Sequence, residues 1–358
     1  MQNRTFTAKQ DRPAVPVGFA GALAASRHRT LAAPGFRDRF PVKPPRWLPA
    51  SVVIDLRDLL GHLWLIPFAI RHRDRDLILV PGFRTNFLLL AMCGLWPLRK
   101  KLLFVVNHNL QFAHVRPLDR PFKLLCRLGV QFALLEGDDG LAELGVANDA
   151  RQFVVIPWPV PDRSAEALEA RQAKPEGPLE MGVVGRDLPE KNTDELMAHL
   201  IALQHAGRLP GRVLFASDND GLMEHWRGQG ALTLNTRSHG DYLAALARAD
   251  VMIMNYERSY YFYRSSAVIN DAASLGTPVV CPDYPIFRRQ VSEPARIGAV
   301  FASAGDILPA IREALELSRD RASDFQLWAR SRSDNAFGRC IDDFISRKRA
   351  PPGSGGRG

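Results

Sequence analysis

The sequence has few cysteines, and they lie far apart. Cys93, Cys126, Cys281 and Cys340 are the only four in 358 residues. They form no CxxC pair, and no Cys/His cluster has the spacing of a metal site. The sequence therefore gives no sign of a disulfide framework or a zinc module, and we expect a reduced, intracellular protein with buried thiols and no bound metal.

Long apolar runs are also missing. The two longest apolar stretches, residues 52–70 and 86–98, fall short of the roughly 20 residues that a membrane-spanning helix needs. The first residues lack the apolar core of a secretory signal, so we expect a cytoplasmic location. Core helices of an α/β layer are the favoured interpretation of both stretches. Basic clusters follow them, at 71–76 and 99–101, and peripheral contact with the inner, anionic face of a membrane stays open as an alternative.

Acidic residues are outnumbered, with 38 Asp and Glu against 47 Lys and Arg and a formal net charge of +9. Such a balance favours anionic partners, namely nucleic acid, an anionic membrane surface or phosphorylated substrates. A nucleic-acid groove interleaves aromatic and basic residues, whereas the tyrosines here cluster in one loop, residues 256–263. We therefore expect no nucleic-acid partner.

The apolar patterns predict two α/β domains. A chain of this length suits two domains, and short buried-strand patterns alternate with helical ones through both halves. The fold class is thus α/β, with two Rossmann-like domains of parallel strands flanked by helices that face each other across a cleft. Residues 1–50 read as a basic flexible tail or an incomplete first βα unit, and 51–160 as the N-terminal, acceptor-binding domain. A linker at 161–178 leads to the C-terminal nucleotide-binding domain at 179–335, and 336–358 reads as a terminal helix with a flexible tail.

The strongest concentration of polar groups lies in the stretch from Asn255 to Val291. An apolar strand at 251–254 precedes a tyrosine-rich loop, and a helix at 265–275 follows, capped by its two serines. The carboxyl ends of parallel strands and the N-termini of helices both favour anionic ligands. We expect a phosphate-bearing ligand here, held by Tyr263, Arg264, Ser265, Ser266 and Asp271.

A second polar segment, GRDLPEKNTDEL, follows the strand predicted at 179–184. Its Gly185, Arg186 and Lys191 come after a strand and just ahead of a helix, which is a suitable place for two cations to clamp a diphosphate. A solvated charged loop is the alternative, and the glycine and helix context favours the clamp. In the first half, the predicted strand at 102–106 ends at His108. This histidine either contacts a ligand or caps and packs the strand end, and His114 is a weaker candidate for ligand contact.

These segments resemble one enzyme family. DAASLGTPVVCPDYP, residues 271–285, is similar to the EAMACGxPVVAxxxGG segment of the GT-B glycosyltransferases of the family 4 type, also called glycosyltransferase group 1. GRDLPEK resembles the family's GRLxPEK, and the strand ending at His108 resembles its TVHD segment. The resemblance implies transfer of a hexose from a nucleoside-diphosphate sugar to a glycan or lipid-linked acceptor, in cell-surface polysaccharide or glycolipid synthesis.

The resemblance also implies roles for single residues. Arg186 and Lys191 would stabilise the departing diphosphate, Asp271 would bind the ribose or nucleotide, and His108 would contact the sugar or acceptor. The donor is a substrate, and no separate cofactor is implied. No DxD tripeptide occurs, and two cations with a helix dipole would neutralise charge without a metal.

One position departs from the family pattern. The family has two glutamates eight residues apart that flank the donor, and they fall on Tyr263 and Asp271 here. Asp271 is a conservative change, but Tyr263 carries no negative charge. A catalytically inactive GT-B-like binding or scaffold subunit is therefore the alternative to a transferase.

Overall fold

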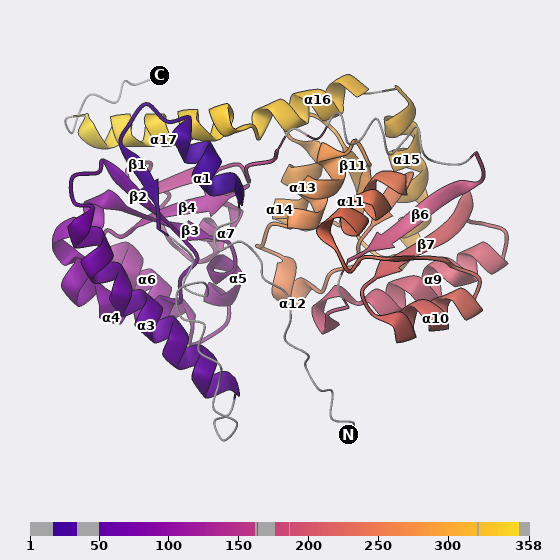
Figure 1. Ribbon diagram of the computed structural model, residues 1–358, viewed down its shortest axis with the longest axis horizontal. Helices are drawn as coiled ribbons and strands as arrows, with labels where there is room; N and C mark the ends of the chain where they lie inside the picture. The colour runs from indigo at the N-terminus through magenta and orange to yellow at the C-terminus, as the bar shows by residue number, and fades with distance from the viewer. Residues whose placement is uncertain are drawn as a thin grey trace.

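The computed structural model describes residues 17–33, 50–161, 163, 176–185, 187–320 and 322–350. Two parallel sheets lie side by side, and helices cover both faces of each one (Figure 1). The C-terminal helices α16 (Ala322–Ser331) and α17 (Asp334–Arg349) run along one side of the molecule from the second unit to the first. The predicted architecture of two Rossmann-like units is confirmed.

The first sheet has five parallel strands in chain order, β1-β2-β3-β4-β5. Its strands are β1 (Thr30–Ala32), β2 (Leu77–Pro81), β3 (Leu102–Val106), β4 (Gln131–Leu135) and β5 (Phe153–Ile156). Its helices are α1 (Val17–Ala24), α3 (Ala50–Arg71), α4 (Thr85–Leu95), the 3₁₀ helix η1 (Trp96–Lys101), α5 (Asn109–Ala113), α6 (Asp119–Arg127) and α7 (Asp139–Glu143).

The strands of this sheet are buried on both faces, which is why they are continuously apolar in sequence. Phe104 and Phe132 point into a core shared with α3, α4 and α6. Their neighbours Leu103 and Ala133 point the other way, toward α1 and α17. This alternation follows from the two-residue period of a strand.

Residues 17–33 belong to the first unit and are not a tail. Helix α1 packs against α17, and β1 pairs in parallel with β2. Of the two interpretations of residues 1–50, a tail or an incomplete first βα unit, the described part 17–33 forms a helix and a strand, and residues 1–16 and 34–49 lie outside the described residues. No helix in the described part of the chain is long and apolar enough to cross a membrane.

The second sheet has six parallel strands in the order β11-β10-β9-β6-β7-β8. Its strands are β6 (Leu179–Val184), β7 (Gly211–Ser217), β8 (Leu232–Asn235), β9 (Val251–Ile253), β10 (Val279–Pro282) and β11 (Gly298–Phe301). Its helices are η2 (Pro189–Lys191), α9 (Thr193–His205), α10 (Asp220–Gly228), α11 (His239–Arg248), α12 (Arg258–Tyr261), α13 (Ala267–Ser274), α14 (Pro285–Ser292), η3 (Ala304–Asp306) and α15 (Ile307–Asp320).

This strand order places a topological switch point between β6 and β9. Counted from β6, the order is that of a doubly wound Rossmann sheet, in which the chain leaves the two central strands in opposite directions. A crevice forms at the carboxyl ends of those two strands, and ligands of such folds bind there. The first sheet has no such reversal among the described strands, so the second unit holds the stronger candidate site.

A buried ion pair joins the two units. Arg332, between α16 and α17, donates from Nη2 to Glu136 Oε2 at 2.7 Å, and the two residues are only 4% and 7% exposed. Glu136 lies just after β4 with a positive φ of 67°, and its carboxylate also accepts the N–H of Trp158 at 2.9 Å. A second guanidinium nitrogen of Arg332 donates to the Glu293 carbonyl at 3.1 Å, at the end of α14. One side chain thus ties three segments together.

A buried carboxylate fixes the interior of the second sheet. Glu180, on β6, is bonded by Arg212 at 2.5 Å and by Arg248 at 2.8 Å. Burial acts to raise the pKa of Glu180, but hydrogen bonds from the two guanidinium groups outweigh it and hold the pKa below its ordinary value. The ionised form is therefore part of the native state.

We expect Glu180→Gln to lower the free energy of unfolding by about 3 kcal/mol at neutral pH, because it leaves two arginines without their carboxylate. Urea denaturation measures the change, with the exposed Glu316→Gln as the control. A depressed carboxyl pKa stabilises the fold above its unfolded value and loses that effect as pH falls through the folded pKa. The difference between wild type and variant should shrink in acid, and a difference that does not depend on pH would contradict this account.

Candidate functional site

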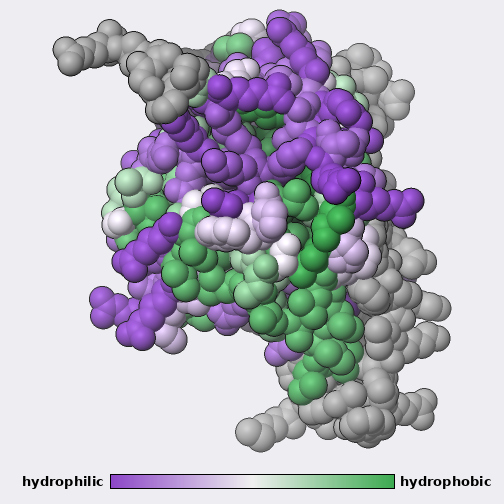
Figure 2. All heavy atoms as spheres, turned by 90° about the vertical axis from the view of Figure 1, so that its left-hand side faces the viewer, coloured by the Kyte–Doolittle hydropathy of each residue, from purple (hydrophilic) through white to green (hydrophobic). Residues whose placement is uncertain are grey.

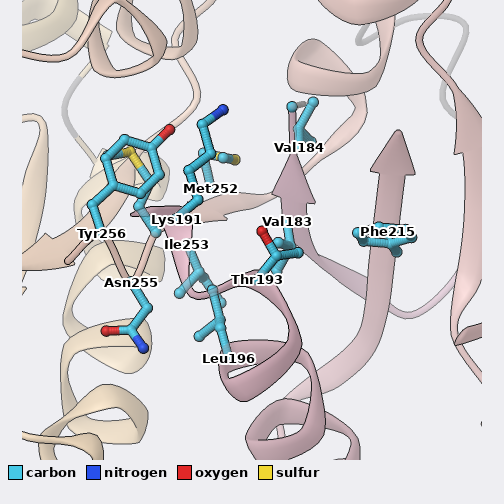
Figure 3. Close-up of a pocket in the computed structure, with 12 residues that line it drawn as sticks. Val183, Val184, Lys191, Thr193, Leu196, Phe215, Met252, Ile253, Asn255 and Tyr256 are labelled. Carbon is cyan, nitrogen blue, oxygen red and sulfur yellow. The ribbon is translucent and has the colours of Figure 1, made fainter. Parts of the chain in front are cut away.

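The candidate site lies at the switch point of the second sheet. A pocket opens at the ends of β6 and β9 and is closed behind by α9 and β7 (Figure 3). Its lining combines apolar strand residues with the polar ends of the strands: Val183, Val184, Gly185, Lys191, Thr193, Leu196, Phe215, Met252, Ile253, Met254, Asn255 and Tyr256. The cavity measures about 20 Å³, room for roughly one water molecule, so a larger ligand would lie across its mouth.

Lys191 is positioned by a tight turn. It ends η2, and Asn192 follows in the left-handed conformation at φ 46° before α9 begins. The Glu190 carbonyl accepts the N–H of Glu257 at 2.8 Å, which fastens this turn to the loop after β9. The Lys191 ammonium lies 5.5 Å from the centre of the Tyr256 ring, and the two side chains meet at one end of the pocket (Figure 3).

Gly185 gives this turn its shape. It lies directly after β6 with φ at 136°, a conformation that residues with a side chain rarely adopt. A Cβ at this position would come 3.1 Å from the Lys191 ammonium nitrogen. Glycine is therefore favoured by the backbone conformation, and a side chain here would push the lysine ammonium slightly aside.

A second cation, Arg264, lies on the tyrosine next to Tyr256. The Arg264 guanidinium lies 4.4 Å from the ring centre of Tyr261, and the rings of Tyr261 and Tyr256 are 4.4 Å apart. Burial lowers the pKa of Arg264. Its Nε is buried and has no hydrogen-bond partner among the residues that the structure describes. Two cations on neighbouring tyrosines, one with an unsatisfied nitrogen, make a favourable place for an anion.

The N-terminus of α13 borders this site. Ser265 and Ser266 are both buried, whereas Ala267 at the first helical position is exposed. The buried Gln290 side chain accepts the Ser266 N–H at 2.9 Å and donates back to the Ser266 carbonyl at 3.1 Å. Ser266 is the N-cap residue, but its hydroxyl makes no capping bond, so the expected serine cap is wrong. Gln290 holds the backbone from behind and leaves the open end of the helix toward solvent.

Asp271 lies one turn further along α13. The Tyr242 hydroxyl donates to its Oδ2 at 3.1 Å. Burial raises the pKa of Asp271, and the charge of Arg163, the bond from Tyr242 and the charge of His239 act in the opposite direction. The carboxylate thus has a phenol donor and two basic side chains near it.

In the first unit, His108 lies at the carboxyl end of a strand. The strand is β3, and His108 is the residue before α5. Its neighbour Asn107 accepts a long hydrogen bond of 3.4 Å from the Ser265 hydroxyl across the two units. This bond brings the end of β3 close to the residues that precede α13.

Tyr263 makes its contacts with the first unit. Its hydroxyl donates to a carboxylate oxygen of Glu143 on α7, and its ring stacks on His114 with centroids 4.0 Å apart. Its N–H donates to Gln111 Oε1 at 2.7 Å, while Gln111 Nε2 donates to the Ser259 carbonyl at 2.8 Å. Burial raises the pKa of Tyr263, and the bond to Glu143 raises it further. The phenol therefore stays protonated and joins the two units.

The predicted residues thus fall into separate groups. Gly185 and Lys191 line the pocket, Arg264 lies on Tyr261 next to the pocket residue Tyr256, Asp271 lies beside Tyr242, and Tyr263 contacts the first unit. Arg186 lies outside the described residues. Gln290, Glu143 and Tyr242 were not singled out from the sequence, because nothing local marks a residue that acts through a distant segment. The described residues contain no cluster of His, Cys, Asp and Glu side chains that could hold a metal ion.

Comparison with known proteins identifies the fold. No protein-family model matches the chain, and no curated protein sequence matches it significantly. Among solved structures, an E. coli structure described as trehalose-6-phosphate bound with UDP-2-fluoro glucose is similar at a TM-score of 0.60 and 13% identity, over 97% of this chain and 98% of the other. An α,α-trehalose 6-phosphate synthase from Burkholderia multivorans gives 0.59 and 14%, over 84% and 77%. Anabaena Alr3699/HepE in complex with UDP gives 0.57 and 15%, over 80% and 82%.

These likenesses cover most of the chain and both units. At such low identities the likeness is one of fold, and the fold is that of the GT-B glycosyltransferases. The sequence motifs predict the same fold.

We expect Gly185→Ala to raise the dissociation constant for a nucleoside diphosphate about tenfold, since backbone strain of roughly 1–3 kcal/mol and the displaced lysine both act on the site. Gly207→Ala is the matched control, because Gly207 also has a positive φ, of 65°, but lies in open space after α9. Calorimetric titration measures both. Equal affinities for the two variants would contradict the assigned role of Gly185.

We expect Tyr263→Phe to lower the free energy of unfolding by about 1 kcal/mol, the contribution of one hydrogen bond. The variant keeps the ring that stacks on His114 and removes only the donor to Glu143. Urea denaturation measures the loss, and the exposed Tyr260→Phe serves as the control. A variant as stable as wild type would show that this bond does not hold the two units together.

Proposed function

We propose that this protein is a glycosyltransferase that moves a sugar from a nucleoside-diphosphate sugar to an acceptor hydroxyl. The observation that carries the proposal is the pairing of Lys191 and Arg264 on adjacent tyrosines at the switch point of a GT-B fold. A departing nucleoside diphosphate gains negative charge on its terminal phosphate. Preorganised cations and a helix N-terminus at that place stabilise the charge as it develops.

In the proposed reaction, the acceptor hydroxyl attacks the anomeric carbon as the bond from that carbon to the phosphate oxygen breaks. The electron pair of the broken bond leaves with the diphosphate, which Lys191, Arg264 and Arg186 would neutralise. The hydroxyl proton passes to a basic group or to the leaving phosphate. Gly185, Ser265 and Ser266 would shape the phosphate subsite, Asp271 would bind the ribose, and His108 would face the sugar or acceptor.

The finer features of the proposal come from the sequence motifs and the fold. Two of the similar structures hold UDP or a UDP-sugar analogue, so uridine diphosphate sugars are the first donors to test. We propose hexosyl transfer of the family 4 type without a metal ion. The acceptor would be a glycan or lipid-linked molecule of cell-surface polysaccharide or glycolipid synthesis, and the reaction would take place in the cytoplasm, at the inner face of the membrane.

One observation favours a second candidate function. Tyr263 occupies the position of a donor-binding acid, and its hydroxyl is bonded to Glu143 in the other unit. A protein with this arrangement could bind a nucleotide and hold the cleft closed without transferring a sugar. The second candidate is therefore a binding or scaffold subunit with the same fold.

We expect one of UDP, GDP, ADP or CMP to raise the melting temperature of the protein. A ligand that binds only the native state stabilises it by about 2.7 kcal/mol at a hundredfold excess over its dissociation constant. The shift should disappear in Lys191→Ala/Arg264→Ala and persist in Arg208→Ala/Arg312→Ala, which removes two exposed cations elsewhere on the second unit. Comparing shifts within each variant removes any effect of the substitutions on basal stability.

A second measurement separates the two functions. Release of the free nucleoside diphosphate from its sugar, with or without added acceptor glycans, is expected for the transferase. A nucleotide-dependent shift without any release would favour the scaffold subunit. No shift with any nucleotide would contradict the donor site itself.

A further inference from the structure

Helix α3 exposes an apolar stripe on the side that faces away from the sheet. The stripe is formed by Val52, Leu56, Leu60, Leu63, Pro67 and Ile70, at steps of four, four, three, four and three residues. Such steps place all six on one side of a helix. Val52, Leu56 and Ile70 are 47%, 52% and 51% exposed. The opposite side of α3 is already buried, with Leu65 and Ala69 in the core of the first unit.

The neighbouring elements extend this apolar surface. Helix α4 packs on α3 and exposes Leu90, and η1 exposes Trp96 at its start. Helix α6, which packs on α4, exposes Leu124. Figure 2 looks onto this side of the molecule and shows a continuous hydrophobic area over its lower half. A patch of this kind on an otherwise charged protein marks a docking surface.

Basic residues border the patch at one end. Arg71 ends α3, and Arg99, Lys100 and Lys101 end η1. The Arg99 guanidinium lies 3.9 Å from the Trp96 ring centre, so apolar and cationic groups meet there. Figure 2 shows the hydrophilic area directly above the hydrophobic one.

The end of α17 adds further positive charge. Lys348 donates to the Gln131 side chain at 2.8 Å and to the Lys100 carbonyl, and the exposed Arg349 reaches the same edge, where it contacts Asp76. The acids of this edge are engaged, since Asp74 pairs with Arg29 and Asp76 with Arg349. On α3 itself, Asp55 and Asp58 both pair with Arg84. The edge therefore keeps an excess of cations.

We propose that this face, named here the α3 face and formed by the stripe, Leu90, Trp96, Leu124 and the basic edge, docks onto a membrane surface that contains anionic lipids. Leucines and a tryptophan beside arginines and lysines match the acyl boundary and the phosphate layer of such a surface. A nucleic acid would use the basic edge and leave the apolar stripe exposed. A second copy of the chain would cover the apolar stripe, but it would offer no layer of phosphate groups to the basic edge.

The inference goes beyond glycosyl transfer and does not depend on it, because no residue of the α3 face belongs to the candidate donor site. It also gives a lipid-linked acceptor a physical route to the protein. If the proposal for the donor site fails, the proposal for the α3 face still stands. If the proposal for the α3 face fails, the donor site is likewise unaffected.

The test is sedimentation of the full chain with phosphatidylcholine vesicles and with vesicles that also contain phosphatidylglycerol. We expect binding to the anionic vesicles and little binding to the neutral ones. Leu56→Ser/Leu63→Ser should weaken that binding about tenfold or more, because two leucines no longer enter the acyl boundary. Val155→Ser/Leu327→Ser, at comparable exposure on other surfaces, should bind as wild type does.

A second pair of variants tests the charges. Arg71→Gln/Lys100→Gln should weaken binding to anionic vesicles by about tenfold or more, because each juxtamembrane cation contributes to the attraction. Arg208→Gln/Arg312→Gln is the matched control. Nucleotide-induced melting shifts should be unchanged in all four variants.

The proposal is overturned if wild type binds neither type of vesicle, or if the stripe variant binds as well as wild type. If wild type does not bind vesicles and the stripe variant melts at a lower temperature than wild type, another segment of this chain covers the stripe. If wild type does not bind vesicles and the stripe variant has a lower molecular mass in solution than wild type, a second copy of the chain covers the stripe.

Discussion

The relative position of the two units depends on the buried pair of Glu136 and Arg332. Two ionised groups this deeply buried are costly to desolvate, and only good geometry and further hydrogen bonds offset that cost. Both conditions are met, because the carboxylate accepts from the guanidinium and from the Trp158 N–H, and the guanidinium also reaches the Glu293 carbonyl. The pair lies where β4 ends and α17 begins, so it sets where the C-terminal helix returns to the first unit. A change there would weaken the attachment of the C-terminal helix to the first unit.

Tyr263 illustrates one consequence of the fixed position of the two units. With the units held in place, a side chain at the family's acidic position reaches α7, and a glutamate at that position would face Glu143 with like charge. A tyrosine instead donates a hydrogen bond and stacks on His114. The substitution thus exchanges a donor-facing charge for a contact between units, which is why a transferase and a binding subunit are both compatible with the rest of the site. The two cations Lys191 and Arg264 do not share this ambiguity, because both lie within the second unit.

Local patterns predict much of this fold, and distant packing accounts for the rest. Continuous apolar runs identify β2, β3, β4 and β6 closely, since parallel strands are buried on both faces. Helix α1 and strand β1 escape prediction because a Pro- and Arg-rich context hides them, and their order is set by α17 and β2, far along the chain. In the site, the GRDLPEK segment follows β6 and places Lys191 in η2, just ahead of α9. The partner of Ser266 could not be predicted, because Gln290 belongs to another helix and its amide replaces the serine cap that local rules favour.

Helix α3 illustrates a limit of periodicity as evidence. An apolar pattern in sequence shows which side chains avoid water, but a helix with apolar residues on opposite sides can bury only one side against its own sheet. The core-helix interpretation is correct for Leu65 and Ala69, and it does not account for the stripe from Val52 to Ile70. The basic clusters after α3 and α4 carry the missing information, because they place an excess of cations where the stripe ends. An apolar side that the fold leaves exposed, bordered by cations, is best explained by a surface outside the protein that is apolar and carries negative charge.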